Sequence, residues 1–129
     1  MSTVIEAKTA DLTGTALNWA VATAIGAYAA ANGSLEIWGC KIWSIPGFKD
    51  MRWDDWTPST DWGQGGVLVD EHIGSLYRDF SAEELPTAVV EGTAIVATGD
   101  TYLIAVCRAI VAAKLGDTVP VPEDLISSP

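Results

Sequence analysis

Residues 100–116 read Asp-Thr-Tyr-Leu-Ile-Ala-Val-Cys-Arg-Ala-Ile-Val-Ala-Ala-Lys-Leu-Gly and are the clearest helical signal in the chain. Asp100 or Thr101 can cap the first turn of this helix. Lys114 in the last turn complements the helix dipole, and Gly116 ends the helix. Apolar side chains recur at a spacing of three and four residues and share one face: Leu103, Val106, Cys107, Ile110, Val111 and Leu115. The pattern predicts a helix whose apolar face is part of the core.

Two more helices are expected, over residues 13–26 and 61–73. In the first, apolar residues again share one face, and Gly26 is a natural closing residue. In the second, Asp61 is the candidate N-cap and Gly74 is expected to end the helix.

Strand-forming residues gather in four short stretches between these helices and before the first of them. The expected strands span residues 4–8, 35–45, 75–80 and 87–97. The last stretch contains Glu91-Gly92, which allows either a hairpin or one bulged strand. The order of elements predicts an α+β fold, a small single domain over residues 1–129 in which about three helices pack on an antiparallel sheet. Residues 115–129 are expected to form an extended C-terminal tail.

The charge balance narrows the classes of partner. The chain has 7 basic and 17 acidic residues, a net charge of −10 at pH 7. Such a surface repels nucleic acid and anionic lipid, so neither is expected as a direct partner. The alanine-rich residues 15–31 are too short and too polar to span a membrane, and no signal peptide is recognisable, so we expect a cytoplasmic protein. Cys40 and Cys107 match no metal-binding spacing and are expected to be buried, reduced thiols.

Tryptophan is concentrated in one part of the chain. Five of the six tryptophans lie between residues 38 and 62. Trp38 and Trp43 belong to the predicted strand and are expected in the core. Trp53, Trp56 and Trp62 lie in a loop and at a helix start, where they either pin the loop onto the core or line a binding site. The sequence leaves both interpretations open.

No catalytic or metal-binding signature is complete. The single histidine, His72, has no nucleophile at a recognisable spacing, and zinc hydrolysis would need more ligands than the chain offers. Residues 63–66, Gly-Gln-Gly-Gly, lack the Lys-Ser/Thr of a phosphate-binding loop. Asp54, Asp55 and Asp61 could hold a cation or act as an acid/base pair, but a solvated loop with Asp61 as N-cap is simpler. We therefore predict no catalytic residues, no metal and no cofactor.

Three segments resemble one known family. They are residues 9–22, 55–73 and 101–122, and they occur in the order seen in the NinX-like family of phage and prophage proteins. Val67 stands where the family has proline, and Thr101-Tyr102 stands where Thr-Pro is usual before the last helix. The resemblance implies a single NinX-like domain that acts as a phage accessory protein in the host cytoplasm. It implies no reaction.

The residues of the central motif, which is Pro58 to Leu68 in the second of these segments, suggest a ligand site. A helix start at Ser59-Thr60-Asp61 exposes N–H groups and hydroxyls that can bind an anion. Tryptophan faces stack on nucleobases, and basic side chains are available nearby. The predicted ligand-binding residues are Arg52, Trp53, Trp56, Ser59, Thr60, Asp61, Trp62 and Arg108.

These residues favour a protein that binds a small nucleotide-like ligand without catalysing a reaction. For a phage protein, the most specific form of this hypothesis is a sponge, a protein that binds and sequesters a cyclic nucleotide immune signal of the host. A homo-oligomer is expected, because ligand pockets often form between subunits. The alternative is an acidic inhibitor that binds a basic host enzyme. An enzyme acting on nucleotides is a third hypothesis.

Overall fold

The computed structural model of the chain describes residues 4–30, 32–34, 37–78 and 85–125. Among these residues there are three α-helices, which are α1 (Gly14–Ala24), α2 (Trp62–His72) and α3 (Tyr102–Leu115). The strands form three small antiparallel sheets. The α+β class is confirmed, but the expected single sheet is divided into three.

The sheets combine strands from different parts of the chain. β1 (Val4–Lys8) pairs with β8 (Thr118–Pro122). The second sheet contains β2 (Tyr28–Ala29), β3 (Ile42–Ser44) and β4 (Met51–Arg52). The third contains β5 (Ile73–Arg78), β6 (Pro86–Val90) and β7 (Val96–Thr98). Three short 3-10 helices complete the order: η1 (Thr9–Asp11), η2 (Trp53–Asp55) and η3 (Glu123–Leu125).

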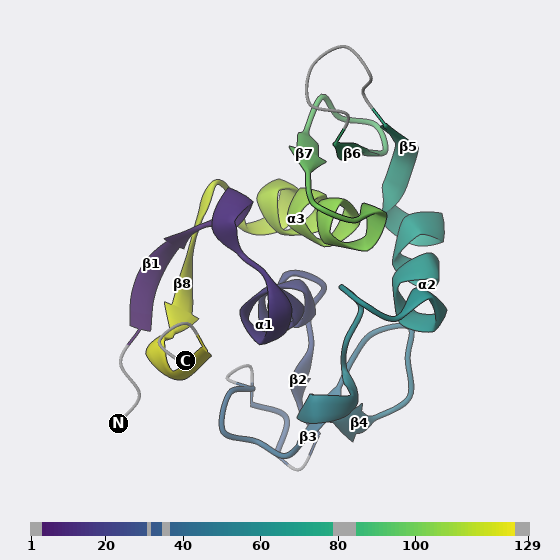
Figure 1. The fold of residues 1–129 in the computed structure, drawn as a ribbon. Helices are drawn as coiled ribbons and strands as arrows, with labels where there is room; N and C mark the ends of the chain where they lie inside the picture. Colours follow the sequence, from purple (N-terminus) through teal and green to yellow (C-terminus); the bar gives the residue numbers. More distant parts are fainter. Residues whose placement is uncertain (1–3, 31, 35–36, 79–84, 126–129) are drawn as a thin grey trace.

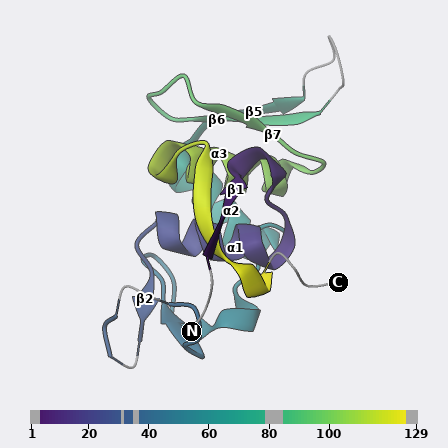
Figure 2. The same cartoon turned by 90° about the vertical axis from the view of Figure 1, so that its left-hand side faces the viewer.

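Helix α3 lies in the middle of the molecule. Figures 1 and 2 both show it between the β5–β6–β7 sheet on one side and α1 on the other. Its caps are those predicted: Thr101 Oγ1 accepts the Ile104 N–H at 3.1 Å, and Gly116 follows the helix with a φ of 99°. Seven of its residues are buried, so α3 supplies the core that the outer elements cover.

The predicted strand over residues 35–45 is wrong for residues 37–41. Only Ile42–Ser44 is extended and paired, and residues 35 and 36 lie outside the described part of the chain. The reason is the indole of Trp43, whose Nε1 donates to the carbonyls of Ile37 at 2.9 Å and Cys40 at 3.1 Å. These carbonyls turn toward a buried side chain, so they cannot point sideways into a sheet.

Gly74 does not end α2 as predicted. The chain passes directly from His72 into β5, and Gly74 lies at an irregularity in the β5–β6 pairing. A Cβ at this position would lie 3.1 Å from the Cα of Glu91, which is tighter than most Cβ contacts, so glycine favours the close approach of the two strands. Residues 87–97 form the hairpin rather than one bulged strand, with Gly92 at a φ of 74° in its turn.

None of the helices in the described ranges combines the length and the apolar character that crossing a bilayer requires.

Helices α2 and α3 approach closely at Gly65. A Cβ there would collide with the Leu103 side chain and would lie 2.8 Å from the carbonyl oxygen of Pro58. The adjacent Gly66 has open space at the same point. Gly65 and Gly66 therefore have different roles, because only Gly65 is required by packing.

We expect Gly65→Ala to destabilise the protein by about 1–3 kcal/mol, because the added methyl group overpacks the α2–α3 contact. Gly66→Ala is the matched control, and it should stabilise the protein by up to about 1 kcal/mol through helix propensity. Chemical denaturation of both variants measures the two free energies of unfolding. A shift of the same sign and size in both would contradict the packing argument.

Candidate functional site

A buried asparagine attaches the tryptophan-rich loop to α1. Asn18 Oδ1 accepts the backbone N–H of Ser59 at 3.0 Å, and the Asn18 carbonyl accepts the Trp56 indole N–H at 2.9 Å. All three residues are buried. Because a buried donor is costly to leave without a partner, these two bonds define where residues 56–59 lie.

The start of α2 is held by its own side chains. Asp61 accepts the Gly63 N–H at 2.7 Å, which confirms it as the N-cap. Gln64 bridges back to the loop, because its Oε1 accepts the Thr57 N–H at 2.7 Å and its Nε2 donates to the Asp55 carbonyl at 2.8 Å. The loop is therefore anchored at both ends before any ligand binds.

Between the N-terminal ends of α2 and α3 there is a pocket of about 410 Å³, which we call the α2–α3 pocket. It brings together three of the predicted residues, Ser59, Thr60 and Trp62. The other lining residues are Arg78, Asp100, Thr101, Tyr102, Leu103 and Ile104.

The lining of the α2–α3 pocket combines aromatic and polar groups. Trp62 is 55% exposed, and the Arg78 guanidinium lies 5.4 Å from the centre of the Tyr102 ring. The first-turn N–H groups of α3 have no partner within the helix, but that of Ile104 is already bonded to Thr101 Oγ1. Ser59 Oγ is enclosed and has no hydrogen-bond partner among the described residues. This set can offer a stacking surface, a cation and several hydrogen-bonding groups to one ligand.

Trp53 and Trp56 lie elsewhere. They line a smaller pocket of about 200 Å³ together with Trp19 and Trp43, and we call it the indole pocket. Its other lining residues are Thr15, Asn18, Asp54 and Thr57. The expectation of one ligand framed by Trp53, Trp56 and Trp62 is thus corrected to two separate pockets. The cause is the bond from Trp56 to Asn18, which turns this indole into the core, where it is 1% exposed.

The two predicted arginines are in neither pocket. Arg52 forms an exposed ion pair with Asp54 at 3.1 Å, and the hydrogen bond between them raises the pKa of Arg52 and lowers the pKa of Asp54. Arg108 donates to the carbonyls of Leu12 and Thr98, both at 3.0 Å, and so ties α3 to two neighbouring segments.

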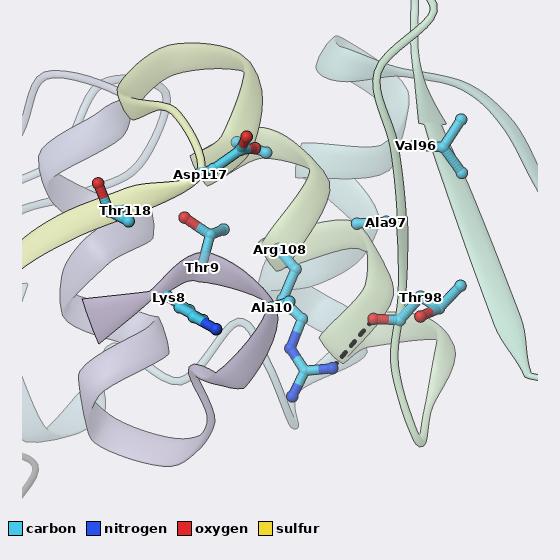
Figure 3. Close-up of a pocket in the computed structure, with 10 residues that line it drawn as sticks. Lys8, Thr9, Ala10, Val96, Ala97, Thr98, Arg108, Asp117 and Thr118 are labelled. Carbon is cyan, nitrogen blue, oxygen red and sulfur yellow. Dashed lines mark hydrogen bonds between the residues drawn. The ribbon is translucent and has the colours of Figure 1, made fainter.

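Arg108 lines a third pocket of about 410 Å³, between β7 and the segment around η1. Figure 3 shows its guanidinium bonded to the Thr98 carbonyl, with Lys8 and Thr9 on the facing segment. The carbonyls occupy two sides of the guanidinium, and the pocket has no aromatic lining residue. It therefore suits a nucleobase less well than the α2–α3 pocket does.

The predicted set of ligand-binding residues did not include Arg78, Tyr102 or Trp19. Arg78 ends β5 and Tyr102 begins α3, so only the tertiary fold brings them to Trp62. One signal was available for Tyr102, because it stands where the resembled family has proline. Trp19 lies on α1 beside the apolar stripe and was not linked to the other tryptophans.

The nucleophilic and metal-binding side chains are scattered. Burial raises the pKa of the Cys107 thiol to about 12. Cys40 is half-buried rather than buried as expected, and its thiol donates to the Ile42 carbonyl at 3.2 Å. His72 lies 3.9 Å from Glu71. Within the described ranges, no group of three or more His, Cys, Asp or Glu residues is arranged to hold a metal ion.

Comparison with known proteins identifies a phage family. The family model described as Bacteriophage P22, NinX matches residues 8–114, which is most of the chain. No curated protein matches the chain. The matched span includes α1, α2 and α3 up to Lys114 and every residue that lines the α2–α3 and indole pockets.

We expect Asn18→Ala to lower the free energy of unfolding by about 1–3 kcal/mol, because the buried Ser59 N–H loses its acceptor. Asn32→Ala is the matched control, since the Asn32 side chain accepts the Ser34 N–H at 2.9 Å in an exposed turn where water can replace it. Urea denaturation measures both variants. If the free energy of unfolding fell by the same amount in both variants, the buried Asn18 bond would contribute no more than the exposed Asn32 bond.

Proposed function

Because the chain belongs to the bacteriophage P22 NinX family, we propose that it is a phage accessory protein that binds a small nucleotide-like ligand in the host cytoplasm without catalysing a reaction. The ligand site of this proposal is the α2–α3 pocket. The observation that carries it is an exposed indole, Trp62, lining the same pocket as the guanidinium of Arg78.

The base of the ligand would stack on Trp62. An indole that is 55% exposed has a face or edge available to a planar ring, and stacking on an aromatic side chain contributes about 1–3 kcal/mol per base. The volume of about 410 Å³ falls in the range of small-molecule sites, roughly 300–1,000 Å³. A mononucleotide or one half of a cyclic dinucleotide suits a pocket of this size.

The phosphate would bind where positive charge and N–H groups meet. Arg78 supplies the charge, and the first turn of α3 supplies backbone N–H groups and the positive end of its dipole. Asp100 lines the same pocket, and the chain has a net charge of −10, so a highly charged anion is disfavoured. A phosphodiester carries one negative charge, whereas a terminal phosphate carries about 1.5 to 2. This difference favours a cyclic nucleotide.

A protein that binds a ligand without converting it can remove only as many ligand molecules as it has binding sites. It therefore lowers the free concentration of a signal by holding that signal, which is how a sponge protein acts. In a phage protein the fitting target is a cyclic nucleotide immune signal of the host. We also propose a homo-oligomer, since Tyr77 and Val96 of the β5–β6–β7 sheet are large side chains about half exposed.

Calorimetric titration against cyclic nucleotides and cyclic ADP-ribose isomers should detect binding of at least one ligand. Trp62→Ala should weaken that binding about 5- to 100-fold, the equivalent of one stacked base. Trp53→Ala is the control, because its indole lines the other pocket, and it should leave the affinity unchanged.

Absence of heat across the panel would reject nucleotide binding, and equal affinities of the wild type and Trp62→Ala would reject this pocket. Recovering the ligand intact by chromatography tests the absence of turnover. Light scattering on the same samples gives the mass, and a monomer with and without ligand would reject the oligomer.

The alternative proposal is an acidic inhibitor of a basic host enzyme, and the net charge of −10 supports it. It predicts capture of a basic host protein that is strong at low salt and lost at about 0.5 M salt, where charges are screened within a few ångströms. Capture from host lysate at both salt concentrations is the measurement. No captured protein at low salt would contradict this alternative.

A further inference from the structure

Four tryptophans from separate segments line the indole pocket. Trp19 comes from α1, Trp43 from β3, Trp53 from η2, and Trp56 from the residue that follows η2. A volume of about 200 Å³ is below that of most small-molecule sites, so the pocket suits a head group rather than a whole nucleotide.

Three of the four indoles are held in place before any ligand binds, whereas the Nε1 of Trp19 is enclosed and has no hydrogen-bond partner among the described residues. The Nε1 of Trp43 donates to two backbone carbonyls, and the Nε1 of Trp56 donates to the Asn18 carbonyl. Trp53 packs edge-on against Trp38, with ring centres 5.5 Å apart and an interplanar angle of 81°. Binding therefore requires little ordering of the aromatic walls, which favours affinity.

The charge of the indole pocket is negative. Asp54 is the one ionisable side chain that lines it, and the hydrogen bond from Arg52 keeps the pKa of this carboxyl below its usual value. Arg52 is not part of the lining. Trp43 and Trp56 are 1% exposed and offer a ligand almost no surface, whereas Trp19 and Trp53 are half-buried. Indole faces carry negative electrostatic potential, so Trp19 and Trp53 favour a cation together with Asp54.

We propose that the indole pocket binds a small quaternary ammonium head group. Such a cation has no N–H donors, so it needs no hydrogen-bond acceptors, and its diffuse charge interacts with aromatic surfaces. A primary ammonium would need an acceptor for each of its three N–H groups, and the indoles supply none, so it would depend on the side-chain oxygens of the other lining residues. Asp54 at the pocket provides the single opposite charge. This site is independent of the nucleotide site proposed for the α2–α3 pocket.

Titration with tetramethylammonium and with choline tests the proposal, using indole fluorescence and calorimetry at constant ionic strength. Dimethylbutanol, the uncharged carbon analogue of choline, is the control ligand. We expect saturable binding of both cations and at least tenfold weaker binding of the analogue, because only a cation gains from the aromatic walls and from Asp54. Equal binding of choline and its analogue, or no binding of either cation, would overturn the proposal.

Single substitutions separate the contribution of the aromatic side chains to choline binding from the contribution of the Asp54 charge. Trp53→Ala should weaken choline binding about tenfold, since one aromatic wall is lost. Asp54→Asn should weaken it about threefold, whereas Asp55→Asn, the same change at an adjacent exposed residue that does not line the pocket, should have no effect. Arg52→Ala should strengthen binding, because it releases Asp54 from its ion pair. Equal effects of the two aspartate variants would overturn the role of Asp54.

Asp54 and Asp55 are on the surface, so this pair of variants remains informative if Trp53→Ala fails to fold. Trp62→Ala should leave choline binding unchanged, which separates this site from the nucleotide site. Loss of choline binding in Trp62→Ala would contradict that separation.

Discussion

The hydrogen bond between Asn18 Oδ1 and the Ser59 N–H is the contact on which both pockets depend. It joins α1 to a loop 41 residues later, and the Asn18 carbonyl binds Trp56 beside it. Through Trp56 the same asparagine defines a wall of the indole pocket, and through Ser59 it defines a wall of the α2–α3 pocket. Because the donor and acceptor are both buried, moving the loop away would leave two buried polar groups without a partner.

The two pockets offer groups of opposite charge to a ligand, although both belong to the same acidic chain. Arg78 and the first turn of α3 give the α2–α3 pocket groups that attract an anion. Asp54 and the half-buried indoles of Trp19 and Trp53 give the indole pocket groups that attract a cation. Net charge acts over long distances, but a ligand in contact with the protein responds to the few groups around it. A net charge of −10 is therefore compatible with both proposals.

Local patterns predicted the helices well and placed Trp43 correctly in the core, but they did not separate the buried Trp56 from the exposed Trp62. The caps Thr101 and Asp61 act within one turn, so sequence spacing was sufficient to find them. The position of an indole depends on carbonyls that the fold brings to it, and the Trp56 bond spans 38 residues. The same physics explains why residues 37–41 do not form the predicted strand, because the Trp43 indole donates to the Ile37 and Cys40 carbonyls. Ser59, Thr60 and Trp62 were predicted together because they are adjacent in sequence, whereas Arg78 and Tyr102 join them only in the folded chain.

The pairing of β1 with β8 determines when the N-terminal part of the described chain can finish folding. The β1–β8 ribbon is a separate two-stranded sheet, and Thr9 Oγ1 closes it by donating to the Gly116 carbonyl at 2.6 Å. Contacts between residues this far apart form late, because the chain between them must first become compact. During synthesis on the ribosome, β1 therefore waits without its strand partner until Thr118–Pro122 has left the exit tunnel. The nascent chain completes this ribbon only after α1, α2 and α3 have all been made.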